Sequence, residues 1–317
     1  MILSVAMNPA IDKTLFVEEL KLGATNRAVD VSRNIGGKGI NVAKNARALG
    51  AEVTVVGFIG EKSKLVFEDY LSSLGIKYDF VVIPPQVDVR ENIKLIETST
   101  GRLTEINEGG PEVSKQLFEV LKQKISQYSK RADVTVLSGS LPQGLSVSAY
   151  KEIITEIREN TKVILDASGD ALKQGIEASP PFMIKPNLQE FSQLLGKNFE
   201  EIREIVAAAR ELMDKYGISV ICVSMGARGG SVTITSERAY YAEPLYIEDV
   251  KTPVGAGDAL VAGFAHAFEK GLGIVDAIKI ATATASTSII SEDTGPIDLE
   301  VFRALLSRIE ITEGDKQ

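Results

Sequence analysis

Residues 252–258, TPVGAGD in one-letter code, combine small residues with a carboxylate just before a long run of small and apolar residues. Glycines let backbone N–H groups approach a ligand closely, and the start of a helix adds unpaired N–H donors. Gly255, Ala256 and Gly257 therefore predict an anion hole. Asp258 can accept a proton from an attacking hydroxyl, although aspartate also caps helices. Alone, the carboxylate leaves both roles open, and its glycine neighbours favour catalysis.

A second glycine motif covers residues 36–41, GGKGIN, and also leads into a predicted helix. Gly36 and Gly37 beside Lys38 indicate that the backbone approaches a polar ligand. The spacing does not match a P-loop, which needs four residues between its first glycine and Gly-Lys-Ser/Thr. A flexible surface turn with a solvated lysine is the alternative interpretation.

Polar residues follow a predicted strand at 185–190, KPNLQE. Such a run can bring a carboxylate and an amide close to a phosphate and Mg²⁺, which prefers oxygen ligands. The simpler interpretation is that proline begins a helix and Glu190 lies in its first turn. A glycine-rich turn at 224–230 is equally open, because it can hold a nucleotide or serve only as a sharp turn into a strand at 231–235.

Two further side chains have types suited to a sugar phosphate. Asp12 follows the first predicted strand and can bind sugar hydroxyls. Arg90 can bond two phosphate oxygens at once through its planar fork, or form an ordinary exposed ion pair.

Composition narrows the function classes. The chain has 317 residues, a net charge of −8 and 25% charged residues, with a pI of about 5.0. An acidic protein of this kind lacks the clustered cations that nucleic acids or anionic membranes require. An anionic substrate would need basic residues concentrated locally, and Lys38, Arg90 and Lys185 are the candidates.

The single cysteine, Cys222, excludes an intramolecular disulfide and a zinc site built from cysteines. Its apolar neighbours predict a buried strand position, and the single histidine, His266, lies in a predicted helix. No signal peptide is evident, and no apolar run reaches the ~18 residues of a membrane span. We therefore expect a cytoplasmic protein.

Apolar runs that alternate with helical patterns predict a mostly parallel sheet covered on both faces, with ligands beyond the carboxyl ends of its strands. The predicted strands are 2–7, 52–59, 133–137, 162–166, 182–185 and 219–223. The predicted helices are 39–49, 64–74, 115–128, 149–159, 188–194, 200–216, 258–270, 274–291 and 299–309. The polar tail 312–317 is expected to be frayed.

Two segments interrupt this alternation. Residues 12–17 with 27–32, and 92–97 with 102–107, show the period-two pattern of antiparallel strands. They cannot join a parallel sheet without crossovers, so we expect a small separate sheet from about 12–33 and 90–108, serving as a lid or an interface.

The order of these motifs resembles the ribokinase-like (PfkB) family of sugar kinases along the whole chain, 1–317. The motifs at 36–41 and 252–258 are similar to the two signatures of that family. The resemblance implies a three-layer Rossmann-like domain with a β-sheet lid, and a homodimer formed through that lid. It implies MgATP and a sugar phosphate as ligands, and direct phosphoryl transfer with Asp258 as the base.

The same resemblance assigns the remaining site residues. Sugar binding is implied for Asp12, Gly36, Gly37, Lys38, Asn41, Arg90 and Ser138, the last near the phosphate already on the sugar together with Lys38 and Arg90. ATP binding is implied for Lys185, Ser224, Gly226, Ala227, Gly229 and Gly257. Glu190 and Asn187 are implied near Mg²⁺, through water.

Within the family, residues 90–94 are most similar to bacterial kinases of fructose 1-phosphate, with kinases of tagatose 6-phosphate as near neighbours. Val89 departs from the threonine common at this place. Two other function classes remain as alternatives. A non-catalytic sugar-phosphate sensor would be expected to lack the base, and a Rossmann dehydrogenase needs Gly-x-Gly-x-x-Gly after the first strand, where this chain has Asn8 and Pro9.

Overall fold

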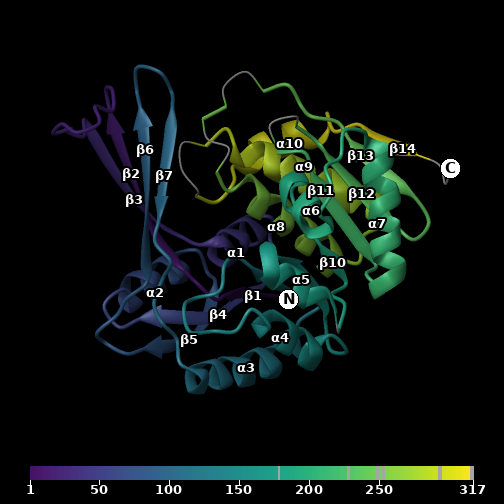
Figure 1. Cartoon of the computed structure of the whole chain (residues 1–317), viewed down its shortest axis with the longest axis horizontal. Coiled ribbons are helices and arrows are strands. Elements are labelled where there is room, and N and C mark those ends of the chain that lie inside the picture. The colour runs from purple at the N-terminus through teal and green to yellow at the C-terminus, as the bar shows by residue number, and fades with distance from the viewer. Residues whose placement is uncertain (178, 227–228, 248–249, 252–253, 292–294, 315–317) are drawn as a thin grey trace.

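A computed structural model describes residues 1–177, 179–226, 229–247, 250–251, 254–291 and 295–314 (Figure 1). A large central sheet has the strand order β14-β13-β12-β11-β10-β9-β8-β1-β4-β5. Its strands are β1 Ile2–Ala6, β4 Val53–Gly60, β5 Lys77–Ile83, β8 Val134–Ser138, β9 Lys162–Asp166, β10 Met183–Ile184, β11 Val220–Ser224, β12 Ser231–Thr235, β13 Ala239–Ala242 and β14 Ile311–Gly314.

Seven neighbouring strands of this sheet are parallel, namely β5, β4, β1, β8, β9, β10 and β11. Strands β12, β13 and β14 continue the sheet as an antiparallel edge. The mostly parallel sheet is therefore confirmed. The prediction of a frayed tail from residue 312 was wrong for Thr312–Gly314, which pair with Ala239–Tyr241 of β13. This backbone pairing orders that part of the tail, and the polar side chains of the tail give no sign of it in the sequence.

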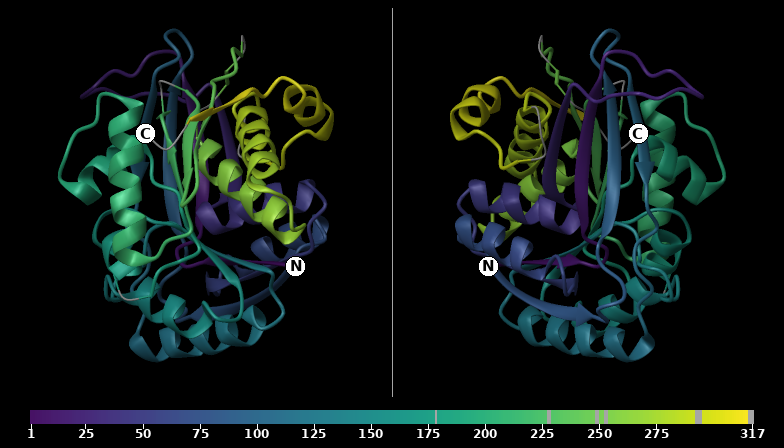
Figure 2. Two further views of the ribbon diagram at one scale, coloured as in Figure 1. Left: turned by 90° about the vertical axis from the view of Figure 1, so that its right-hand side faces the viewer. Right: turned by 90° about the vertical axis from the view of Figure 1, so that its left-hand side faces the viewer.

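Helices cover both faces of the sheet and complete three layers (Figure 2). One face carries α3 Lys115–Ser129, α4 Ala149–Ile157, α5 Gly169–Glu177, α6 Leu188–Leu195 and α7 Ile202–Tyr216. The other carries α1 Lys38–Ala48, α2 Lys64–Ser73, α8 Ala256–Glu269 and α9 Ile274–Ser288, with α10 Leu299–Leu306 packed on α9. Strand residues alternate between the two cores: Ile221 of β11 belongs to the first and its neighbour Cys222 to the second. Cys222 is fully buried in a strand, as predicted.

A separate four-stranded sheet stands beside the main domain and has the order β3-β2-β6-β7 (Figure 1). We call it the lid sheet. It consists of β2 Ala10–Val17, β3 Asp30–Gly36, β6 Arg90–Glu97 and β7 Leu103–Asn107. Both predicted antiparallel pairs are present, and a parallel β2–β6 pairing joins them.

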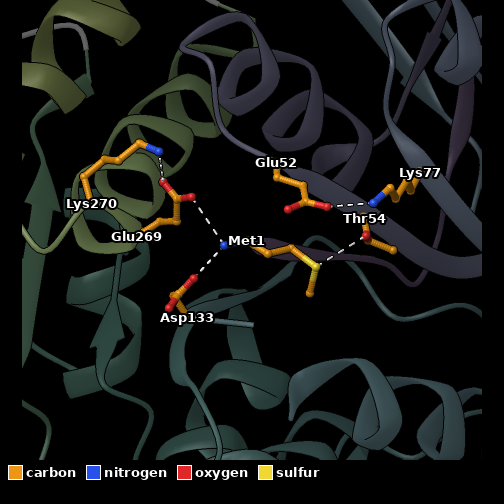
Figure 3. Close-up of polar contacts among 7 residues, drawn as sticks. All are labelled: Met1, Glu52, Thr54, Lys77, Asp133, Glu269 and Lys270. Carbon is orange, nitrogen blue, oxygen red and sulfur yellow. Dashed lines mark hydrogen bonds and ion pairs between the residues drawn. The ribbon is translucent and has the colours of Figure 1, made fainter. Parts of the chain in front are cut away.

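Ion pairs connect residues at or next to the amino ends of β1, β4, β5 and β8 in the central sheet (Figure 3). The amino group of Met1 lies 2.5 Å from the Asp133 carboxylate and 3.3 Å from that of Glu269 in α8. Burial alone would lower the pKa of this amino group, but the two carboxylates raise it. Lys77 pairs with Glu52 at 2.7 Å between the starts of β5 and β4. Among the described helices, none has the length and apolar character needed to cross a membrane.

Candidate active site

A cavity of ≈ 600 Å³ opens between the carboxyl ends of the parallel strands, the lid sheet and the first turn of α8. Parallel strands end at one edge, so polar residues that follow β10 and β11 meet there with the β3–α1 junction. The residues predicted from sequence that line this cavity are Asp12, Gly37, Lys38, Asn41, Arg90, Lys185, Asn187, Glu190, Ser224, Gly226, Gly229, Gly255, Ala256, Gly257 and Asp258.

Three predicted residues are not among the cavity-lining residues. Gly36 packs directly against Asp12, which does line the cavity. A Cβ at position 36 would lie only 2.6 Å from the Asp12 carboxylate. Ser138, at the end of β8, is buried and its hydroxyl has no hydrogen-bond partner among the described residues. Ala227 lies outside the described residues.

The first turn of α8 has the geometry of an anion hole. Gly255 precedes the helix with a φ of 87°, a left-handed conformation that glycine adopts without strain. The first helical hydrogen bond is donated by Ala259 to the Gly255 carbonyl. The N–H groups of Ala256 and Gly257 therefore have no partner within the helix. The ammonium group of Lys185 lies beside Gly257, 3.5 Å from where a Cβ would stand.

Asp258 is the third residue of α8, so it does not occupy the cap position. That position belongs to Gly255, and no side-chain hydrogen bond caps the start of this helix. Its carboxylate is buried and accepts a hydrogen bond of 2.8 Å from the side-chain amide of Asn41. Burial raises the pKa of Asp258 to about 6, against the opposing effects of Lys38 and the Asn41 hydrogen bond. A carboxylate with such a pKa is ionised at neutral pH and basic enough to take a proton.

Asp166, a residue that the sequence analysis did not single out, holds two cations together. Its fully buried carboxylate lies 3.0 Å from the Lys38 ammonium and 3.1 Å from that of Lys185. Burial alone would raise the pKa of Asp166, but the attraction of Lys185 and Lys38 lowers it. Its position at the carboxyl end of a predicted strand was the available signal.

Arg90 and Asp12 lie on the lid side of the cavity. The Arg90 guanidinium donates to the Asn8 carbonyl at 3.2 Å and to the Asn92 side chain at 3.2 Å, which fixes its orientation. The Asp12 carboxylate accepts hydrogen bonds from Asn92 at 2.9 Å and from Lys94 at 3.1 Å. Asn92 and Lys94 also line the cavity, and the sequence analysis assigned neither to the site.

Asn187 and Glu190 form the cap of α6. The Asn187 side chain accepts from the Glu190 N–H, and the Glu190 carboxylate accepts from the Asn187 N–H, both at 2.8 Å. The motif therefore forms a helix start with Glu190 in the first turn, which was the simpler interpretation of the sequence. Asn187, rather than Pro186, is the residue at that start. Glu190 still faces the cavity and helps to raise the pKa of Lys38, together with Asp166 and Asp258 and against the effect of burial.

This constellation joins a helix start, a basic carboxylate and clustered cations, which are the parts needed to move a phosphoryl group. The family model described as pfkB family carbohydrate kinase matches residues 4–300. The chain belongs to the pfkB family. As a pfkB kinase, it is an ATP-dependent sugar kinase.

The relatives of this pfkB kinase cover nearly its whole length. It is 32% identical to a 1-phosphofructokinase from Haemophilus influenzae over 98% of both chains. It is 34% identical to a 1-phosphofructokinase from Borreliella burgdorferi over 92% of both chains.

Solved structures share the fold. Phosphofructokinase-2 from Escherichia coli, in complex with substrates and products, superposes with a TM-score of 0.90 at 20% identity over 97% of this chain and 98% of that one. A possible 1-phosphofructokinase from Thermotoga maritima gives 0.87 at 26% identity over 99% of both chains.

The pfkB kinase cavity continues past Ser224 into an apolar region that the sequence analysis missed. Gly226 and Gly229 line this part of the cavity, and the Gly229 N–H donates a hydrogen bond of 2.8 Å to the Gly226 carbonyl. The apolar residues that line the cavity include Pro244, Leu245, Ile247, Ala285 and Ile289. These residues come from the connection after β13 and from the C-terminal end of α9, where Ile289 is the cap residue, and no local motif marks them. His266 in α8 is not among the cavity-lining residues, and burial lowers its pKa.

Proposed function

We propose that this kinase transfers the γ-phosphoryl group of MgATP to fructose 1-phosphate, giving fructose 1,6-bisphosphate, with Asp258 as the general base. The observation that carries the proposal is the placement of a buried carboxylate of raised pKa beside an anion hole, in a cavity that Arg90 of the lid sheet also lines. The names of the Haemophilus and Borreliella relatives support the choice of sugar.

The chemistry follows from the positions of these groups. The free hydroxyl of the sugar binds beside Asp258, which takes its proton as the oxygen attacks phosphorus. The bond from phosphorus to the bridging oxygen of ATP breaks as the new bond forms, and ADP leaves. The N–H groups of Ala256 and Gly257, with Lys185, stabilise the negative charge on the transferring group.

The donor set fits Mg²⁺ bound mainly through water and phosphate. No cluster of three or more metal-ligating side chains occurs among the described residues, and Mg²⁺ with nucleotides needs no such cage. One Glu190 oxygen is engaged by the Asn187 N–H, and its other oxygen can accept from metal-bound water. When bound, the ion would neutralise phosphate charge; Glu190 and Asn187 would hold its waters.

A phosphorylated sugar is favoured because cations from both the main domain and the lid sheet line the cavity. Lys185 stands at the anion hole and shares the Asp166 carboxylate with Lys38, whereas Arg90 comes from the lid sheet. A neutral sugar would give Arg90 no ionic partner. Tagatose 6-phosphate also presents a phosphate and a hydroxymethyl at opposite ends of a ring, so it remains the alternative substrate.

Turnover on a substrate panel tests the proposal. We expect kcat/KM for fructose 1-phosphate to exceed that for tagatose 6-phosphate, fructose 6-phosphate, fructose and ribose by tenfold or more, about 1.4 kcal/mol. A preference for tagatose 6-phosphate would leave the mechanism and change the substrate. A preference for fructose or ribose would refute the phosphate-binding role of Arg90, and no ATP turnover on any of them would refute the proposed substrate.

Arg90→Gln separates phosphate binding from general damage. We expect kcat/KM for fructose 1-phosphate to fall by roughly 10- to 100-fold, the loss of a charge-assisted hydrogen bond. The matched control is Arg102→Gln, because Arg102 lies in the connection between β6 and β7, pairs with Glu97 and does not line the cavity. Equal losses in the two variants would contradict the assignment.

We also propose that two copies associate in the cytoplasm through the lid sheet. Strand register puts Leu15, Val31, Leu95, Ile93 and Ile106 on the face of this sheet opposite Asp12. Val31 and Ile106 are 49% and 60% exposed, and an apolar face of this kind usually marks an interface. Sedimentation of wild type and Ile106→Glu tests this, since a monomeric wild type would refute it.

A further inference from the structure

Alternate residues of β6 present three polar side chains to the cavity. Arg90, Asn92 and Lys94 are spaced by two, so they lie on the same face of the strand, and all three line the cavity. The neighbouring strand β2 contributes Asp12 to the same face, directly opposite Asn92 in the parallel register.

Both oxygens of Asp12 are engaged by this row. Asn92 donates to Oδ1 at 2.9 Å, and Lys94 donates to Oδ2 at 3.1 Å. Only 7% of the Asp12 side chain and 10% of the Lys94 side chain are exposed, so water screens the pair weakly. The other end of the Asn92 amide accepts from Arg90 at 3.2 Å.

Asn92 therefore connects the group proposed for phosphate binding to the group proposed for hydroxyl binding. An amide suits this place because it donates to a carboxylate with one end and accepts from a guanidinium with the other. Asp12 also acts on Arg90 electrostatically, since it opposes the effect of burial, which lowers the pKa of Arg90.

A carboxylate in the wall of a pocket for an anionic sugar has an electrostatic cost. If its charge were uncompensated, Asp12 would repel the sugar phosphate and would turn toward water or toward Arg90. Lys94 lies on the same face of β6 as Arg90 and compensates the charge of Asp12. Arg90 therefore stays available to the ligand.

We propose that Lys94 is a positioning residue for sugar recognition, which neutralises Asp12 and holds its carboxylate in place while Asn92 links it to Arg90. This inference rests on the proposed sugar-phosphate substrate. The competing explanation is that the Lys94–Asp12 pair only stabilises the lid sheet. The two explanations differ in whether the loss of Lys94 affects the sugar alone, and in whether that effect depends on the Asp12 charge.

The test compares Lys94→Met, Lys94→Arg and the same changes in an Asp12→Asn background. We expect Lys94→Met to raise the KM for fructose 1-phosphate by about tenfold, with the KM for ATP within about twofold. Lys94→Arg should recover most of this loss because it keeps the charge. In the Asp12→Asn background, Lys94→Met should change the sugar KM by less than about threefold, since no charge is left to neutralise.

Lys77→Met is the matched control, because Lys77 forms an exposed ion pair with Glu52 (Figure 3) and neither residue lines the cavity. Its KM values should equal those of wild type. The inference is overturned if Lys94→Met leaves the sugar KM unchanged, if it raises both KM values equally, or if its effect is as large without the Asp12 charge.

The wild-type substrate panel separates this inference from the proposed function. A wild-type preference for fructose or ribose refutes the sugar-phosphate assignment itself. A preference for fructose 1-phosphate together with an unchanged sugar KM in Lys94→Met refutes only the role of Lys94.

Discussion

Replacing Asp258 by asparagine should destroy activity and stabilise the protein at the same time. The carboxylate is buried, and its pKa is raised from an ordinary value of 3.8 to about 6. A group whose pKa is higher in the folded state favours folding fully below its unfolded pKa, and this contribution is lost as the pH rises through the folded pKa. Ionised Asp258 therefore lowers stability at neutral and alkaline pH.

The size of the effect follows from the shift. A rise in pKa from 3.8 to about 6 corresponds to about 3 kcal/mol at pH 8. Asparagine is neutral at every pH, so Asp258→Asn should raise the free energy of unfolding by up to about 3 kcal/mol at pH 8 and by less than about 1 kcal/mol at pH 4. For 317 residues this is roughly 4 °C in Tm at pH 8.

Two assays read out the prediction. Thermal or urea unfolding at both pH values gives the stability difference, and Asp69→Asn on the exposed side of α2 is the matched control, which should change little. Turnover should fall by on the order of 10²- to 10⁴-fold, as expected for loss of a general base. In wild type, kcat/KM should fall as the pH drops through about 6.

Either of two results would contradict the roles assigned to Asp258. A variant no more stable than wild type at pH 8 would show that the buried carboxylate is not under electrostatic stress. A well-folded variant with near wild-type turnover would show that Asp258 is not the base.

Asp166→Asn should lower the free energy of unfolding by about 3 kcal/mol at pH 7.5, because both lysines beside it lose their shared buried carboxylate; a loss below about 1 kcal/mol in urea unfolding would contradict this. Gly36→Ala adds a methyl group 2.6 Å from the Asp12 carboxylate. Steady-state assays should show the sugar KM rising by roughly tenfold with little change for ATP, and equal changes would count against the role of Asp12. Burial raises the pKa of the Cys222 thiol, so a thiol reagent should label it only after unfolding, and rapid labelling of native protein would disprove its burial.

Strong local periodicity made most of the main domain predictable from sequence. β9 has the predicted bounds, and helices such as α2 and α3 end within one residue of the prediction, because their apolar positions repeat regularly. β5 was missed because its first residues are polar and lie partly exposed at the sheet edge. α5 was missed because it is short and rich in polar residues.

The candidate site was predictable where one motif carries the chemistry, and not where distant residues meet. The 255–258 turn brings its glycines and carboxylate together within one helix start, and the local pattern identified it. Asp166 meets Lys38 across 128 residues, and Lys94 meets Asp12 across 82. The spacing of residues in the sequence does not predict such contacts, because strand register and sheet order bring these side chains together.

The parallel pairing of β2 with β6 also affects the order in which the molecule folds. Asp12 and Asn92 are 80 residues apart, and the chain between them contains α1, β4, α2 and β5. Each lid hairpin is too small to persist alone in water, and closing so long a loop is entropically unfavourable until the central sheet has brought its ends together. The lid sheet therefore forms late, and a refolding chain should recover its sugar pocket only after the domain beneath has assembled.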